Sequence, residues 1–250
     1  MSGTATGKAC RPMVHIVLQA KGGVGKSYVA AIVAQYYSAR QQSVRCFDTD
    51  PGNATLAQYK ALPVEHVGNL IQGGVINQKG FDPLIEKLLN GDGAAIVDTG
   101  ASTFLPFWSY VLENEILSLL ESQGQHVHMH CIVAGGQAMD DTLNGLNRLA
   151  QTISKKSIIV WLNEFFGEVR EGSLPFEQFK LVRDLAPKLV GSVLIRKRNP
   201  DTFEYDVQQM LRNRLTFDEA MAAEDFSLVS KQRLQIVRRE LFEQLDELDL

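Results

Sequence analysis

The sequence predicts an α/β protein, built as a single doubly wound and mostly parallel sheet with helices on both faces. An apolar run at residues 14–18 leads through a glycine-rich loop into a helical pattern. Further apolar runs, at 44–47, 94–97 and 157–162, alternate with helical patterns. Strands that alternate with helices in this way favour a parallel sheet covered by helices. Two of the runs end in aspartate, and the carboxyl ends of parallel strands are where such sheets bind ligands.

The bulk composition fits one globular domain. A chain of 250 residues, 45% hydrophobic and 22% charged, can bury a substantial core. Its net charge of −4 gives no general attraction to nucleic acid or to an acidic membrane. Three cysteines without metal-binding spacing, and no apolar signal or membrane segment, lead us to expect a cytoplasmic protein. We expect residues 1–12 to be a flexible extension and residues 13–250 to form the domain.

The loop at residues 20–27, AKGGVGKS, carries the clearest chemistry. Its glycines allow the backbone to curl so that successive N–H groups point at an anion, and the helix that follows adds its own unpaired N–H groups. Lys26 would reach the β- and γ-phosphates of a nucleotide, and the Ser27 hydroxyl would bind Mg²⁺. The residues predicted to contact the nucleotide here are Gly22, Gly23, Val24, Gly25, Lys26, Ser27 and Tyr28.

Three aspartates follow the second and third apolar runs. Asp48 and Asp50 point to the same side of an extended chain, because side chains alternate along a strand. Asp98 ends the run at 94–97, an arrangement in which a carboxylate binds Mg²⁺ directly or through water. We therefore expect these carboxylates beside the phosphates, where they would handle metal and water.

The run at 21–27, KGGVGKS, resembles the deviant Walker A box of the ParA/MinD family of ATPases, and DTDP at 48–51 resembles that family's second box. The resemblance implies a ParA/MinD-like P-loop NTPase domain that uses ATP and Mg²⁺ and forms an ATP-dependent homodimer. In the family, the lysine at the position of Lys21 reaches across the dimer to the partner's phosphates. Tyr28 departs from the pattern, since most relatives have a small hydroxyl residue there.

The same resemblance implies roles for single residues. Asp48 would help to hold the Mg²⁺ shell, and Asp50 would position or deprotonate the attacking water. Asn163 occupies the position of an asparagine that contacts the adenine base, although a turn-forming asparagine is the alternative. The implied catalytic residues are Lys21, Lys26 and Asp50, and the implied metal ligands are Ser27, Asp48 and Asp98.

The remaining patterns predict further elements. We expect helices at 81–89, 104–120, 140–153 and 175–185, and strands that begin at 126 and at 190. The stretch at 58–80 is irregular, and is either a nucleotide-sensing segment or a surface excursion. We expect a solvated loop at the basic residues Arg196, Lys197 and Arg198. The alternative is that these residues contact nucleic acid together with Arg212 and Arg214.

Three histidines, His126, His128 and His130, face one side of a predicted strand. Their spacing is compatible with a metal site, but no further cluster of ligands accompanies them. We therefore expect solvated histidines at the start of a strand.

Apolar residues at three- and four-residue steps predict a C-terminal helix at 228–250. Helices that bind membranes have a basic polar face, whereas this one ends in acidic residues, so we expect it to pack on the domain or against a partner. Membrane binding is therefore not expected.

Within the ParA/MinD family, the run at 14–20 and the pair Tyr36-Tyr37 look like the TraL/StbB-type proteins of conjugative plasmids. This implies a role in conjugal transfer, partition or stability with a plasmid-encoded DNA-binding or transfer partner, and leaves direct DNA contact open. The alternatives are a membrane-cycling MinD-like positioning ATPase and a metabolic ATP-dependent enzyme. The metabolic enzyme would need a second constellation of catalytic residues, which the sequence does not show.

Overall fold

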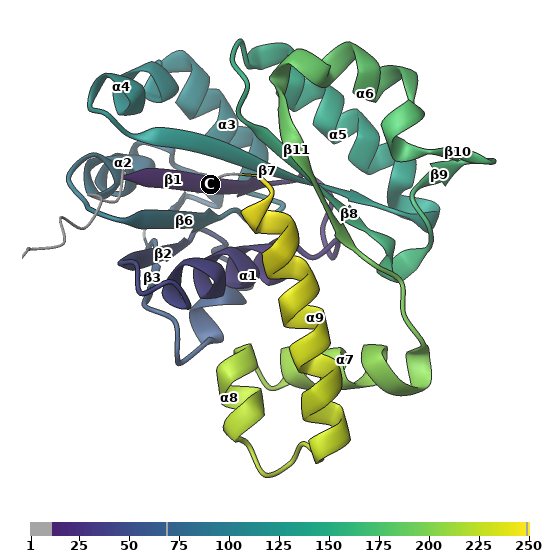
Figure 1. Cartoon of the computed structure of the whole chain (residues 1–250). Helices are drawn as coiled ribbons and strands as arrows, with labels where there is room; N and C mark the ends of the chain where they lie inside the picture. The colour runs from purple at the N-terminus through teal and green to yellow at the C-terminus, as the bar shows by residue number, and fades with distance from the viewer. Residues whose placement is uncertain (1–11, 69, 249) are drawn as a thin grey trace, which may run out of the picture.

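The computed structural model describes residues 12–68, 70–248 and 250, so most of the expected extension at 1–12 lies outside the described residues. At its centre is a seven-stranded sheet in the order β11-β8-β7-β1-β6-β2-β3, with every pair of neighbours parallel (Figure 1). This confirms the predicted fold class. The strands are β1 Met13–Leu18, β2 Val44–Asp48, β3 Val64–His66, β6 Ala94–Asp98, β7 His126–Ala134, β8 Ile158–Asn163 and β11 Leu189–Ile195.

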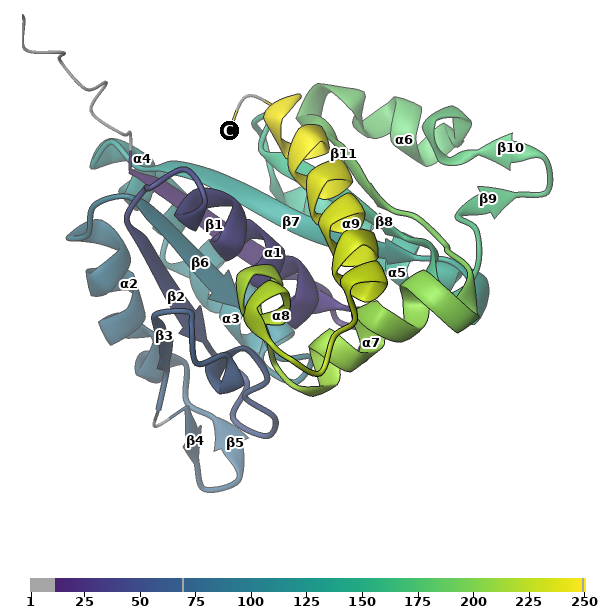
Figure 2. The same cartoon turned by 60° about the horizontal axis from the view of Figure 1, so that its bottom comes forward.

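Helices cover both faces of this sheet (Figures 1 and 2). The helices on one face are α1 Lys26–Ser38, α7 Tyr205–Arg212, α8 Phe217–Ala222 and α9 Leu228–Asp246. Those on the other face are α2 Asp82–Leu89, α3 Phe104–Glu113, α4 Ile116–Ser122, α5 Met139–Thr152 and α6 Lys180–Leu185. Two short hairpins project from this body, β4 Ile71–Gln72 with β5 Val75–Ile76, and β9 Arg170–Glu171 with β10 Leu174–Pro175.

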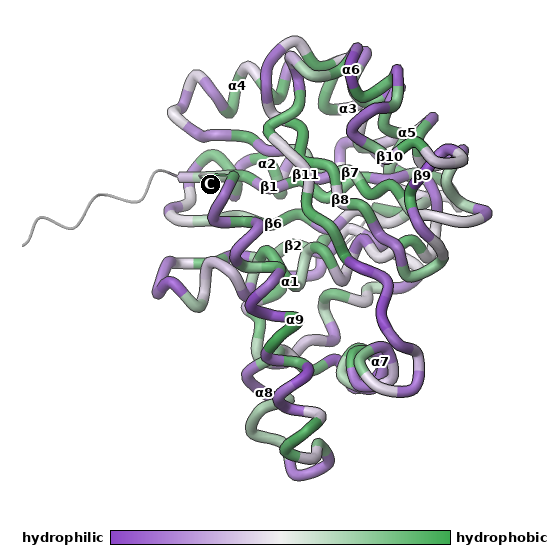
Figure 3. Tube along the Cα trace, turned by 45° about the vertical axis from the view of Figure 1, so that its right-hand side comes forward, coloured by the Kyte–Doolittle hydropathy of each residue, from purple (hydrophilic) through white to green (hydrophobic). Residues whose placement is uncertain are grey.

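The sheet separates two hydrophobic cores. Alternation along β1 sends Ile16 into the core beneath α2 to α6 and Val17 into the core beneath α1 and α9. Because both faces are covered, the central strands are largely hydrophobic, as Figure 3 shows, with the histidines of β1 and β7 as exceptions. The aspartates that end β2 and β6 lie at the carboxyl edge of the sheet, where the site lies.

The single helix expected at 104–120 is two helices. Glu115 adopts a left-handed conformation, with φ at 50°, and the Asn114 N–H bonds back to the Tyr110 carbonyl. This ends α3 in the way that a left-handed cap ends a helix. The break turns Ile116 and Leu120 of α4 into the core.

The helix expected at 175–185 begins only at Lys180. Pro175 belongs to the β9–β10 hairpin, and Phe179 is extended. Phe176 and Phe179 are both buried, and their rings pack edge to face with centroids 5.6 Å apart. Aromatic packing thus overrides the helical pattern here. The irregular stretch at 58–80 also contains a strand, β3, which pairs with β2 at the sheet edge but is too short to give a periodic signal.

The C-terminal helix packs on the domain, as the sequence predicts. Its apolar residues Leu234, Val237, Leu241 and Leu245 are buried. The helix ends at Asp246 rather than at residue 250. Within the described residues, no helix combines the length and the hydropathy that crossing a membrane requires.

The expectation of solvated histidines on β7 is wrong for two of the three. His126 is exposed, but His128 is mostly covered and His130 is fully buried. The strand enters the sheet at His126, so each later histidine on that face lies deeper beneath α1. Among the described residues, no group of three or more histidine, cysteine or carboxylate side chains is arranged to hold a metal ion.

Candidate nucleotide-binding site

The glycine-rich loop joins β1 to α1 at the carboxyl edge of the sheet. Gly25 precedes α1 with φ at 101°, a conformation that strains any residue with a side chain. Buried Gln19 fixes the start of the loop, because its amide donates to the Ile132 carbonyl at 2.7 Å and accepts from the Ala20 N–H at 2.9 Å. No local pattern indicates this role for Gln19, since its partner on β7 is 113 residues away.

Lys26 lies inside the loop and is only 8% exposed. Its ammonium group donates to the Lys21 carbonyl at 3.0 Å. Burial lowers the pKa of Lys26, and the neighbouring carboxylates of Asp98 and Asp50 oppose that shift. The ammonium group therefore lies between the loop backbone and the acidic side chains, where an anion bound in the loop would meet it.

Asp98 ends β6 beside this lysine and is 2% exposed. Burial, together with the nearby charge of Asp48, raises the pKa of Asp98 to about 7, although a hydrogen bond from the Ser27 hydroxyl opposes the shift. Its Oδ1 atom is buried and has no hydrogen-bond partner among the described residues. A buried carboxylate oxygen without a partner, next to a hydroxyl, is a donor set that suits a hard cation such as Mg²⁺. Ser27 and Asp98 therefore fit the metal that the sequence implies.

Asp48, the last residue of β2, and Asp50, which follows the strand, form different hydrogen bonds. Asp48 is fully buried, and its two oxygens accept the Asp50 and Ala57 N–H groups, each at 3.0 Å. Burial raises the pKa of Asp48, and these hydrogen bonds oppose the shift. Asp50 is partly exposed, and its Oδ1 atom accepts the Gly52 and Asn53 N–H groups at 2.9 and 3.0 Å. Asp48 thus fastens the loop that presents Asp50.

Gly100 lets the segment after β6 approach Asp50. A Cβ atom at position 100 would lie 2.6 Å from the Asp50 Cγ atom, closer than real contacts allow. The loops that follow β2 and β6 therefore meet at the Asp50 carboxylate.

Two adjoining cavities open around the loop. A cleft of about 370 Å³, the phosphate cleft, is lined by Gly22, Gly23 and residues 25–28 of the loop together with Asp50, Tyr59 and Arg214. A mostly apolar cavity of about 230 Å³ lies next to it, with walls that include Phe165, Phe203 and Asn163. Gly23, Gly25, Tyr28 and Leu211 line both. Together, the two cavities could accommodate a nucleotide, because a polar cleft for its phosphates lies beside an apolar space for its base.

Asn163 lies at the end of β8 and is buried in the wall of the apolar cavity. Its amide nitrogen donates to the Val24 carbonyl at 2.9 Å, and its amide oxygen accepts the Phe165 N–H at 3.1 Å. The contact with the Phe165 N–H is the turn-forming role that was the alternative, and the contact with an adenine base stays a prediction. In this position Asn163 also holds the loop backbone in place.

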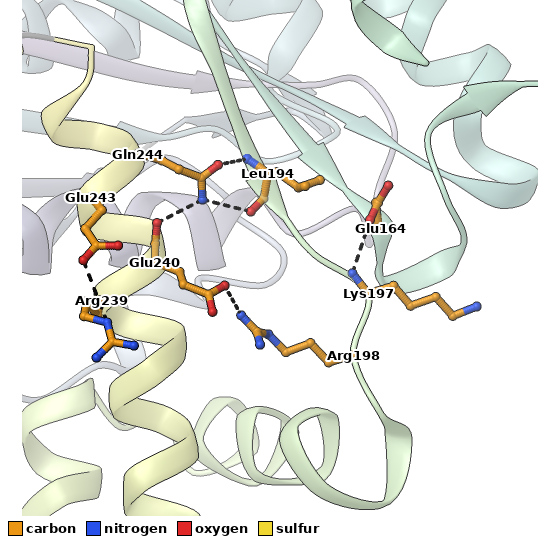
Figure 4. Close-up of polar contacts among 8 residues, drawn as sticks. All are labelled: Glu164, Leu194, Lys197, Arg198, Arg239, Glu240, Glu243 and Gln244. Atoms are coloured by element: carbon orange, nitrogen blue, oxygen red, sulfur yellow. Dashed lines mark hydrogen bonds and ion pairs between the residues drawn. The ribbon is translucent and has the colours of Figure 1, made fainter. Parts of the chain in front are cut away.

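The loop after β11 forms another wall of the apolar cavity, and α9 holds it (Figure 4). The Gln244 amide bonds both to the N–H and to the carbonyl of Leu194, at 2.7 and 3.2 Å. Arg198 forms an ion pair with Glu240 at 2.5 Å and lies over the Phe203 ring. The Arg198 side chain is only 17% exposed, so the expectation of a solvated loop is wrong at this residue.

Lys21 points away from the phosphate cleft. Its ammonium group forms an ion pair with Asp141, on the first turn of α5, at 2.7 Å. Both side chains are about half exposed. Within one subunit, this lysine therefore lies at the rim of the loop.

A family model described as the CobQ/CobB/MinD/ParA nucleotide binding domain matches residues 15–216. Two Escherichia coli proteins, each named Protein TraL, are 41% and 39% identical over 234 residues, which is 93% of this chain and 97% of each relative. Among solved structures, the MinD cell division protein of Aquifex aeolicus matches with a TM-score of 0.53 and 14% identity, over 92% of this chain and 97% of that one.

A second solved structure is the septum site-determining protein MinD complexed with Mg-ADP from Pyrococcus horikoshii OT3. It matches with a TM-score of 0.54 and 15% identity, over 95% of this chain and 97% of that one. At such identities, these two matches show a shared fold.

Proposed function

The chain belongs to the CobQ/CobB/MinD/ParA nucleotide-binding family, and from this premise we propose that it is a Mg²⁺-dependent ATPase. We further propose that its nucleotide state switches a homodimer. One observation carries the proposal: the loop that holds Lys26 faces a buried carboxylate, Asp98, with an oxygen that lacks a partner among the described residues. A cation and a phosphate chain bound between them would supply the missing contacts.

In the proposed reaction, water attacks the γ-phosphorus of ATP, the bond to the bridging oxygen breaks, and ADP and phosphate leave. Lys26 and the loop N–H groups would stabilise charge on the phosphate oxygens. Ser27 and Asp98 would hold Mg²⁺, which would supply positive charge to offset that of the phosphate oxygens. Asp48 would support this shell by holding the Asp50 amide in place.

Asp50 is the proposed residue for positioning or deprotonating the water. Two backbone N–H groups fix one of its oxygens, so the carboxylate is held in one orientation at the cleft. Lys21 would act on the partner's nucleotide, adding positive charge as the phosphoryl group transfers. To do so, it must exchange Asp141 for the partner's phosphates when two subunits meet.

The proposed setting is plasmid transfer, partition or stability, in the cytoplasm and with a plasmid-encoded partner. The resemblance to TraL/StbB-type proteins and the two relatives named Protein TraL support this setting. The buried apolar face of α9 argues against the membrane-cycling alternative, because insertion would remove that face from the core.

Calorimetry and phosphate release with ATP and Mg²⁺ test the proposal. We expect the wild type to bind and hydrolyse ATP, and Lys26→Ala to lose about 100-fold or more in affinity or turnover. Lys155→Ala is the matched control, because it removes the same charge from an exposed site on the loop after α5. A wild type that binds neither ATP nor ADP in the millimolar range would overturn the proposal.

The dimer is tested separately by analytical ultracentrifugation. Asp50→Ala should accumulate an ATP-bound dimer, and Lys21→Ala should prevent it. A protein that hydrolyses ATP as a monomer would refute the switch and leave the ATPase standing.

A further inference from the structure

Arg214 lies in the short linker between α7 and α8, and its side chain lines the phosphate cleft together with Lys26 and Ser27. Arg214 comes from the C-terminal part of the sequence, whereas the loop comes from the N-terminal part. Lys26, Arg214 and Asp50 are the charged side chains among the described residues that line this cleft. Arg214 therefore provides half of the positive charge at the place where a phosphate chain would lie.

The backbone at Arg214 is in a left-handed conformation, with φ at 54°. This conformation is strained for a residue with a side chain, and such strain is often found at ligand-binding positions. The Arg214 N–H donates to the Leu211 carbonyl, which closes α7 and aims the side chain back toward the cleft. This strained backbone conformation thus places the guanidinium group beside the loop.

The acceptors of this guanidinium group are neutral. Its Nε atom donates to the Gln58 amide oxygen at 3.1 Å, and its Nη1 atom donates to the Leu211 carbonyl at 2.8 Å. Nearby arginines on or against α9, in contrast, pair with carboxylates: Arg198 with Glu240, Arg233 with Asp206 and Arg238 with Asp218. An arginine held by an amide oxygen gains more from a phosphate, because hydrogen bonds between two charged groups are stronger.

Gln58 connects Arg214 to the acidic side of the site. It ends η1 Leu56–Gln58, and the N–H of the preceding Ala57 binds the Asp48 carboxylate. If the hydrogen bond between Arg214 and Gln58 were lost, the segment that carries Asp50 would therefore be affected. This contact spans 156 residues of sequence, so nothing in the local pattern points to it.

We propose that Arg214 binds the phosphate chain of the nucleotide in its own subunit, and exchanges the Gln58 amide for a phosphate oxygen on binding. The inference rests on the proposed function, since it names a further residue of the same nucleotide site. Arg214 supplies from within the subunit a positive charge that Lys21, paired with Asp141 at the rim, does not supply to its own cleft.

Calorimetric titration with ADP and with AMPPNP, both with Mg²⁺, tests the inference. Arg214→Ala should weaken both affinities about 10- to 100-fold, the range expected for a lost hydrogen bond to a charged group. Arg212→Ala is the matched control, because Arg212 is exposed, bonds to Gln208 and does not line the cleft. Arg214→Lys should recover part of the affinity, since it keeps the positive charge but lacks the planar guanidinium group, which can donate two parallel hydrogen bonds to a phosphate.

Two further variants separate phosphate binding from structural support. Gln58→Ala breaks the contact to η1 but keeps the cation, and should leave the affinity unchanged or raise it. Arg214→Gly relieves the backbone strain, and should bind as weakly as Arg214→Ala without a lower melting temperature.

The outcomes distinguish this inference from the proposed function. An Arg214→Ala variant within twofold of Arg212→Ala would overturn the inference, as would a Gln58→Ala variant that weakens binding as much as Arg214→Ala does. A wild type that binds neither ADP nor AMPPNP would instead overturn the proposed function, and this inference with it.

Discussion

Two clusters of buried ionisable side chains lie on adjacent strands of the sheet, at different distances from its carboxyl edge. The acidic cluster, Asp48 and Asp98, ends β2 and β6, where the two residues are paired in register. The histidine cluster, His15, His128 and His130, lies within β1 and β7, in the core beneath α1. Burial disfavours charge in both, and raises the pKa of Asp98 while it lowers the pKa of His130.

In the histidine cluster, His130 is bonded to the protein at both ring nitrogens, whereas His15 Nε2 and His128 Nδ1 are buried without a hydrogen-bond partner among the described residues. Trp161 Nε1 donates to His130 Nδ1 at 2.8 Å, which places the proton of neutral His130 on Nε2. That nitrogen lies 2.9 Å from His15 Nδ1, to which it donates. The rings of His15 and His128 stack with centroids 5.5 Å apart. These contacts fix one tautomer for the pair and tie three central strands together.

The acidic cluster, in contrast, lies next to the phosphate-binding loop, beside Ser27 and Lys26. Asp98 Oδ1 has no partner among the described residues, and the side chains beside it are a hydroxyl and an ammonium group. Both clusters therefore contain buried atoms without a partner among the described residues, and they differ in what surrounds those atoms. Asp98 Oδ1 lies at a strand end beside the phosphate-binding loop, where a bound ligand can satisfy it, whereas the unpartnered nitrogens of His15 and His128 lie within strands beneath α1.

The largest expected effect tests the acidic side of this comparison. Asp98→Asn should lower Mg²⁺-dependent ATP turnover about 100-fold or more, because an amide is a poor ligand for the metal. It should also raise the free energy of unfolding of the nucleotide-free protein by about 1 kcal/mol, because an amide is easier to bury than a carboxylate. Phosphate release and urea unfolding measure the two effects.

The control for Asp98→Asn is Asp92→Asn, an exposed aspartate on the loop before β6. It should change neither quantity. If Asp98→Asn loses stability and keeps its turnover, Asp98 is a structural residue and the contrast with the histidines disappears.

The next effect tests the histidine side. His130→Ala removes the acceptor of Trp161 and the donor to His15, and leaves a cavity, so it should lower the free energy of unfolding by about 3 kcal/mol. Its affinity for ADP should stay within twofold of the wild type at temperatures where the variant is folded. His126→Ala, on the exposed start of the same strand, should cost less than about 0.5 kcal/mol. A loss of nucleotide affinity in His130→Ala would show that the histidine cluster also supports nucleotide binding.

The pH dependence of that loss is a smaller effect with a defined sign. Burial lowers the pKa of His130 to about 3, against 6.5 in the unfolded chain. Above pH 6.5 the ring is neutral in both states; below it, the unfolded chain takes up a proton that the folded protein refuses, so stability is lost as the pH falls. His130→Ala lacks this loss, so its destabilisation should shrink by about 2 kcal/mol between pH 6.5 and pH 5.

Urea unfolding of the wild type and of His130→Ala across this range measures the difference, in which the other titrating groups largely cancel. A destabilisation that stays constant with pH would mean that His130 is protonated in the folded protein or reached by water.

The two clusters also differ in how far the sequence could predict them. Asp48, Asp98 and the loop around Lys26 were predictable, because each lies at the end of an apolar run and parallel strands bring their carboxyl ends together. The histidine network was not predictable, since His15 and His130 become neighbours only through the register of β1 with β7. Arg214 was missed in its role for the same reason: its cleft is assembled from opposite ends of the chain.

The smallest expected effect concerns the exposed rim of the cleft, where Lys21 pairs with Asp141. Because both side chains are about half exposed, the pair should contribute less than about 1 kcal/mol to stability. If Lys21 must leave Asp141 to reach the partner's phosphates, Asp141→Asn should strengthen ATP-dependent dimerisation about two- to fivefold. Asp140→Asn, its exposed neighbour on the first turn of α5, is the control. Sedimentation with ATP and Mg²⁺ measures the dimer, and a weaker dimer in Asp141→Asn would show that the ion pair positions Lys21 for the partner instead of restraining it.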